Sequence, residues 1–137
     1  MNADEKVELV RKAVEQAMTA GPHSLLERYD ELCTADFRWT PALEGADYVG
    51  RDGLTRAFDD FGTSFDRFSY RSADFRAVGE DTVIAKLRIA VHGAESGVPI
   101  DQDLAWVFRF RGDKVESAKT YLNWADAEAA AEGRAHA

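Results

Sequence analysis

The clearest alternation of apolar and polar positions lies near the end of the chain, over residues 100–111. One face carries Ile100, Gln102, Leu104, Trp106, Phe108 and Phe110, and the other carries Asp101, Asp103, Ala105, Val107, Arg109 and Arg111. A period of two over this length is typical of a half-buried β-strand, because successive side chains point to opposite sides of the pleat. Turn residues follow at 111–114, and a second β-rich run covers 115–121. We therefore predict a β-hairpin.

The register of this hairpin decides which side chains of its second strand share a face with Trp106. A bulged hairpin places Thr120 on that face. A tight two-residue turn at Gly112 and Asp113 instead brings Lys119 and Tyr121 there, because a slip of one residue turns every side chain to the other face. The sequence leaves both registers open.

Helical spacing of apolar residues predicts three helices in the first half of the chain. The first covers 2–20, with Asn2 and Glu5 as a capping box, and it ends at Gly21. Pro22 begins a second, shorter helix. The third runs over about 52–65, where an aromatic stripe is typical of core packing.

The remaining elements are strands, and their order predicts the fold class. We expect strands over 36–40, 68–78 and 82–91, a loop over 42–50, and a short helix over 126–132 after the hairpin. Helices early and strands late indicate an α+β fold, with the helices packed on one face of a mostly antiparallel sheet. The opposite face of the hairpin, with Asp101 and Asp103, is expected to be solvated or part of a dimer contact.

Composition narrows the class of protein. The chain has 137 residues, 45% apolar and 31% charged, which suits one globular domain. A net charge of −8 without a run of basic residues argues against nucleic acid and anionic membranes as partners. Cys33 is the single cysteine, so no intrachain disulfide forms, and we expect a buried thiol and a cytoplasmic protein.

Four stretches together resemble one known family. They are VELVRKAVEQAMTAG at 7–21, ADFRW at 35–39, GRDGL at 50–54 and DQDLAWVFRFRGDKVESAKTYLN at 101–123. The chain resembles the SnoaL-like polyketide cyclase and ketosteroid isomerase branch of the nuclear transport factor 2-like superfamily. The resemblance implies one domain over 1–137, with its core at about 5–124 and a short C-terminal helix or tail over 125–137. It also implies a cone-shaped, strongly curved, mixed but mostly antiparallel sheet wrapped around three N-terminal helices as a cystatin-like α+β barrel. An apolar pocket and a homodimer are implied as well.

The catalytic residues of that branch are not retained. By the resemblance, the ketosteroid isomerase Tyr, general base and oxyanion-hole Asp fall at Val14, Pro41 and Trp106. Neither Val nor Pro can take these roles, and an indole donates a hydrogen bond but does not titrate. The last-strand Asp of the epoxide hydrolase branch falls at Thr120. Whether the chain is an enzyme is left open.

The candidate site residues come from two places. Glu44 and Asp47 lie in the loop after Trp39, where a carboxylate beside apolar walls could move protons; the alternative is that both are solvated loop charges. The expected pocket residues are Trp39, Tyr48, Gln102, Trp106, Phe108, Thr120 and Leu122. The polar ones either satisfy one another or wait for a ligand.

No metal or cofactor is expected. His23, His92 and His136 are scattered, and GRDG at 50–53 lacks the third glycine of a dinucleotide site. Two functions remain in view. One is a cofactor-free isomerase, cyclase or hydrolase acting on a hydrophobic small molecule. The other is a non-catalytic module that binds an apolar ligand, or a dimeric scaffold.

Overall fold

The computed structural model describes residues 1–41, 47–65, 68–92 and 99–135. Its first helix, α1 (Ala3–Ala20), begins with the predicted capping box: the side chain of Asn2 accepts from the backbone of Glu5, and the side chain of Glu5 accepts in return. Gly21 ends the helix at a φ of 90°, a backbone conformation that favours glycine. A 3₁₀ helix, η1 (Pro22–Arg28), and a single α-turn, α2 (Tyr29–Leu32), follow.

The strands of the described residues form one six-stranded sheet in the order β2-β1-β6-β5-β4-β3. Their bounds are β1 (Cys33–Thr40), β2 (Tyr48–Val49), β3 (Phe68–Val78), β4 (Thr82–His92), β5 (Pro99–Arg111) and β6 (Lys114–Tyr121). The last four strands form an antiparallel meander, whereas β1 runs parallel to β6. The α+β prediction is confirmed. The sheet is curved, as expected, but it stays open rather than closing into a barrel.

Strand pairing changes one predicted boundary and adds one short strand that was not predicted. The first strand begins at Cys33 rather than Asp36, since Cys33 pairs with Val115 of β6. Within the expected loop, Tyr48 and Val49 form the two-residue strand β2 against Trp39 and Arg38 of β1. A strand of two residues is too short to show a period of its own, so the sequence could not reveal it.

The β5–β6 hairpin combines the two registers that the sequence left open. Arg111 pairs with Lys114 around a tight turn, in which Gly112 has a φ of 64°. The register then shifts between Arg109 and Phe110, so that Glu116 is an extra residue on β6. This bulge reverses the effect of the tight turn, because one extra residue moves every later side chain to the opposite face. Thr120 consequently lies opposite Trp106.

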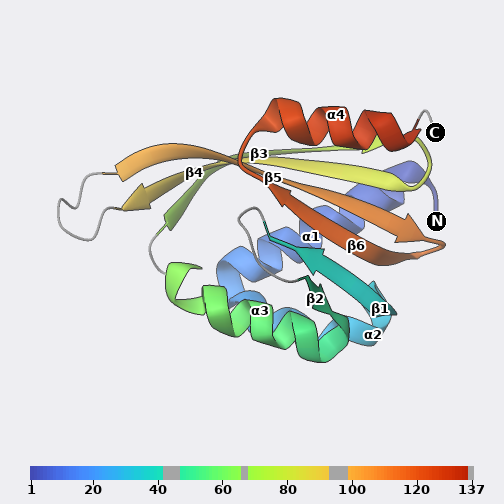
Figure 1. Ribbon diagram of the computed structural model, residues 1–137, viewed down its shortest axis with the longest axis horizontal. Coiled ribbons are helices and arrows are strands. Elements are labelled where there is room, and N and C mark those ends of the chain that lie inside the picture. Colours follow the sequence, from blue (N-terminus) through green and yellow to red (C-terminus); the bar gives the residue numbers. More distant parts are fainter. Residues whose placement is uncertain (42–46, 66–67, 93–98, 136–137) are drawn as a thin grey trace.

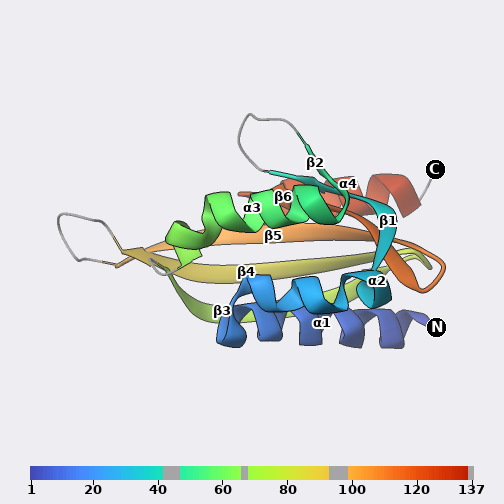
Figure 2. The ribbon, with the colours of Figure 1, turned by 90° about the horizontal axis from the view of Figure 1, so that it is seen from below.

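Helices cover both faces of the sheet (Figure 1). The inner face is covered by α1, η1, α2 and the long helix α3 (Gly50–Phe65). Figure 2, seen from below, shows α1 and α3 against this face of the sheet. The main core lies between them and the sheet. Its least exposed members include Val10, Phe37, Val83, Leu87 and Phe110. The aromatic stripe of α3 contributes Phe58, which is 6% exposed, as its core role predicted.

The outer face is not simply solvated, as was expected, because the C-terminal helix α4 (Trp124–Ala135) packs on it. Ala127 and Ala131 of α4 are fully buried against Ile84, Ala105 and Val107 of the sheet. Small residues let the helix approach the strands closely. The expectation failed because α4 has a weak apolar stripe, carried by two alanines, and the sequence therefore gave little sign of where it docks.

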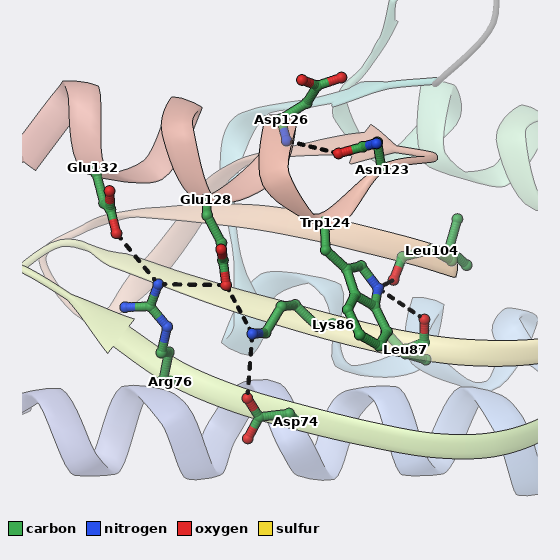
Figure 3. Close-up of polar contacts among 10 residues, drawn as sticks. All are labelled: Asp74, Arg76, Lys86, Leu87, Leu104, Asn123, Trp124, Asp126, Glu128 and Glu132. Carbon is green, nitrogen blue, oxygen red and sulfur yellow. Dashed lines mark hydrogen bonds and ion pairs between the residues drawn. The ribbon is translucent and has the colours of Figure 1, made fainter. Parts of the chain in front are cut away.

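Polar contacts at the edges of α4 fix its position (Figure 3). The indole Nε1 of Trp124 lies 3.1 Å from the carbonyl oxygen of Leu87 and 3.2 Å from that of Leu104. Glu128 accepts from Lys86 at 2.7 Å. Arg109 donates to the carbonyl oxygen of Ala130 at 3.0 Å. These contacts tie the helix to strands β4 and β5.

Candidate functional site

Two neighbouring cavities lie between the inner helices and the sheet. The first is lined by Leu9, Val10, Ala13, Leu25, Tyr29, Leu32, Cys33, Phe37, Trp39, Leu54, Phe58, Phe108 and Val115. The second is lined by Ala13, Val14, Ala17, Met18, Pro22, Leu25, Trp39, Phe58, Trp106 and Phe108. Each leaves about 80 Å³ for the centre of a water-sized sphere, whereas one buried water needs roughly 10–15 Å³ by this measure. The aromatic side chains therefore leave space in the core.

The walls of both cavities consist almost entirely of carbon. In the first cavity, the hydroxyl of Tyr29 is already used, because it donates to the carbonyl oxygen of Thr34 at 2.8 Å. The Cys33 thiol also borders this cavity, and its burial raises the pKa to about 12. A thiol with this pKa stays protonated near neutral pH and is a poor nucleophile. The cavities thus suit an apolar molecule.

Three buried polar atoms have no hydrogen-bond partner among the described residues and belong to neighbouring side chains of β1, β5 and β6: Nε1 of Trp39, Nε1 of Trp106 and Oγ1 of Thr120. The two indole rings lie with their centroids 6.0 Å apart and tilted by 57°. Trp39 borders both cavities and Trp106 the second, while Thr120 lies opposite Trp106 on β6. Buried donors normally have partners, and these lie behind the carbon walls of the cavities, so an acceptor on a ligand reaches them only if a neighbouring ring turns.

The structure brings together only some of the predicted pocket residues. Trp39, Trp106 and Phe108 line the cavities. Gln102 does not: its amide nitrogen donates to the carbonyl oxygens of Asp103 and Leu122, at 2.8 Å and 3.4 Å. Leu122 is 46% exposed. The space that was expected beside Gln102 therefore lies deeper, under α1.

Of the two predicted proton-transfer residues, only Asp47 lies in the described part of the chain. It pairs with Arg38, with 3.0 Å between the carboxylate and guanidinium atoms, and it lines neither cavity. Its neighbour Tyr48 lies on β2, where its backbone packs over Gly53 of α3. Glu44 lies outside the described residues.

The structure also adds cavity residues that the sequence analysis did not place in the pocket. They come from α1, η1 and β1, and include Ala13, Leu25 and Phe37. The helical stripes that carry Val10, Val14, Met18 and Leu25 were the available signal. A stripe shows that side chains face inward, but it does not show whether they fill the interior or leave a space.

The acidic residues of the outer face take part in surface pairs. Asp103 lies 3.0 Å from the guanidinium of Arg88, which in turn lies 5.3 Å from the ring centroid of Trp124. Among the described residues, no group of three His, Cys, Asp or Glu side chains could hold a metal ion. In the same part of the chain, no helix is long and apolar enough to cross a membrane.

Comparison with known proteins supports one family and one fold. A family model described as a SnoaL-like domain matches residues 10–118. No curated protein matches the chain significantly. Similar solved structures include nuclear transport factor 2-like proteins from three bacteria.

The protein from Anabaena variabilis is 22% identical, with a TM-score of 0.68, over 88% of this chain and 90% of its own. The protein from Burkholderia pseudomallei, described as of unknown function, is 16% identical, with a TM-score of 0.69, over 88% and 92%. The protein from Burkholderia xenovorans is 18% identical, with a TM-score of 0.67, over 98% of both chains. At these identities the likeness concerns the fold alone.

Proposed function

The chain belongs to the SnoaL-like domain family, and from this membership and the two core cavities we propose that it binds an apolar small molecule between α1, α3 and the inner face of the sheet. The observation that carries the proposal is the space itself. Trp39, Trp106 and Phe108 meet beside the cavities without filling them, although protein interiors are normally packed to the density of organic crystals.

The unpartnered donors refine the chemistry of the proposed ligand. Two indole N–H groups can donate but cannot accept, so they match an oxygen with lone pairs, such as a carbonyl or hydroxyl. In the part of the chain that the structure describes, none of the residues that line the cavities carries a charge. An ionised group inside them would be costly, since a buried charge needs a partner. The ligand is thus mainly hydrocarbon with an uncharged oxygen.

Binding, rather than turnover, is the function that the geometry supports best. Val14 and Trp106 border the second cavity, and neither can move a proton at neutral pH. Among the described residues, no Asp, Glu or His lines either cavity. Catalysis by Glu44 and Asp47 stays a prediction. Its test is Asp47→Asn, together with Glu44→Gln, in an assay of any molecule shown to bind.

The test of binding combines thermal unfolding with tryptophan emission. Apolar probes of two shapes, pyrene and decanol, are titrated into the full chain. We expect at least one probe to raise the melting temperature, because a ligand of the folded state stabilises it, and to alter the emission of Trp39 and Trp106.

A matched pair of variants ties the signal to the cavities. Ala13 borders both cavities, so Ala13→Phe fills space in each, whereas Ala129 is exposed on α4. We expect Ala13→Phe to reduce binding and Ala129→Phe to retain it. The proposal is rejected if neither probe binds to the wild-type protein, or if a folded Ala13→Phe variant binds as well as the wild type.

A further inference from the structure

The two cavities share part of their walls. Five residues line both: Ala13, Leu25, Trp39, Phe58 and Phe108. The two spaces therefore lie next to each other, and the material between them belongs to these shared residues. Side chains such as Leu25 can change rotamer, so the division between the cavities can open without movement of the sheet.

The cavities follow each other along α1. Leu9 and Val10 border only the first, and Val14, Ala17 and Met18 border only the second, with Ala13 between the two sets. The helix rises about 1.5 Å per residue, so the distance from Leu9 to Met18 along its axis is about 14 Å. The combined space is therefore long in the direction of α1.

The space is divided into two parts of about equal volume, about 80 Å³ each. A compact polycyclic molecule needs its volume in one chamber. An extended chain of methylene groups needs only a narrow passage between two chambers.

We propose that the ligand is an extended aliphatic chain with an uncharged oxygen, lying along α1 through both cavities. This inference rests on the proposed function and specifies the shape of its ligand. Because Trp106 borders only the second cavity, its unpartnered indole N–H places the oxygen in that cavity. The hydrocarbon chain then extends past Leu25 and Phe108 toward Leu32, Cys33 and Val115.

The test is a series of straight-chain primary alcohols from butanol to dodecanol, with dissociation constants measured by calorimetry or tryptophan emission. Each methylene that enters the cavities contributes about 0.8 kcal/mol, which corresponds to an affinity gain of about fourfold per carbon. We expect affinity to increase with chain length and then reach a plateau when both cavities are filled.

Two variants shorten the space from opposite ends. Ala17→Phe fills part of the second cavity, and Leu9→Trp fills part of the first; Ala129→Phe on the outer surface of α4 is the control. We expect either cavity variant to move the plateau to shorter alcohols and Ala129→Phe to leave the whole series unchanged. The second variant keeps the test decisive if the first does not fold.

The outcomes separate this inference from the proposed function. If pyrene binds and the affinity of alcohols does not increase with their length, the chain-shaped ligand is rejected and apolar binding stands. If a folded cavity variant weakens all alcohols equally, the two cavities are not used end to end, and the inference is again rejected. If neither pyrene nor any alcohol binds, the proposed function itself is rejected.

Discussion

Trp106 and Thr120 lie directly opposite each other on β5 and β6, and each buries a polar atom that has no hydrogen-bond partner. Their indole N–H and hydroxyl face the same side of the sheet as Trp39, whose Nε1 is also without a partner. An unmade hydrogen bond of a buried group costs about 1–3 kcal/mol of stability. Each of these groups therefore lowers the stability of the folded protein.

Replacing the Thr120 hydroxyl by a methyl group is expected to stabilise the ligand-free protein. Thr120→Val keeps the shape of the side chain and removes the unpartnered oxygen, so the free energy of unfolding should rise by about 1 kcal/mol. The measurement is urea unfolding followed by circular dichroism.

Thr82→Val is the matched control for this substitution. The hydroxyl of Thr82 donates to Asp81 at 3.1 Å and accepts from Arg109 at 3.0 Å. Its removal takes one hydrogen bond from each of two partly buried partners, and we expect a loss of about 1–3 kcal/mol. Equal effects of the two substitutions would show that the Thr120 hydroxyl is bonded in solution.

Cys33 is expected to react slowly with thiol reagents in the folded protein. Burial raises its pKa to about 12, so at pH 8 roughly one thiol in ten thousand is ionised, compared with about a quarter at the ordinary pKa of 8.5. A disulfide reagent such as dithionitrobenzoate should label Cys33 far faster in denaturant than in buffer. Similar rates in both would contradict the buried position of the thiol.

The docking of α4 is expected to weaken in acid. A hydrogen bond from Lys86, aided by its positive charge, lowers the pKa of Glu128 below its ordinary 4.5. A lowered carboxyl pKa gives stability that is fully present above pH 4.5 and is lost as the pH falls through the lower folded value.

Glu128→Gln isolates this contribution, because the amide does not titrate in that range. The melting temperature of the variant should fall less than that of the wild type between pH 5 and pH 3. Glu27→Gln, which removes an exposed carboxylate on η1, provides a control. Identical acid profiles for wild type and Glu128→Gln would rule out a stabilising role for the Lys86 contact.

Two helical glycines should respond oppositely to alanine. A Cβ at Gly53 would lie 2.8 Å from the backbone carbon of Tyr48, so Gly53→Ala must move β2 away from α3 and should destabilise the protein by about 1–3 kcal/mol. At Gly133 in α4 a Cβ meets nothing within 4 Å. Gly133→Ala should therefore stabilise by up to about 1 kcal/mol, since alanine favours the helix. The free energy of unfolding of both variants is measured in urea. A Gly53→Ala variant more stable than the Gly133→Ala variant would contradict this prediction.

The sequence predicted the fold well where one face of an element is strongly apolar. The strict alternation over 100–111 and the capped stripe of α1 are local patterns, and both elements form as expected. The hairpin register was not predictable, because it depends on a tight turn at Gly112 and a bulge at Glu116 acting together. The tight turn alone would place Thr120 on the outer face, and the bulge returns it to the face of Trp106.

The candidate site was predicted only in part, and the reason is again physical. Trp39, Trp106 and Phe108 could be placed near a pocket from the alternation and the resemblance. That Gln102 bonds to backbone carbonyls instead depends on the positions of Asp103 and Leu122 in three dimensions. The shape of the space depends on how completely the side chains of α1 fill the interior, and no periodicity encodes this.

The indole of Trp124 has a consequence for the order of folding. Its two acceptors, Leu87 and Leu104, are direct partners across β4 and β5, so the pair exists only after these strands have aligned in their final register. On an unpaired or slipped sheet, the Trp124 indole therefore lacks at least one of its two acceptors. We expect α4 to dock late in folding, after the β3–β6 meander has formed. In refolding experiments, Trp124 emission should reach its final value after the amides of β4 and β5 become protected from exchange.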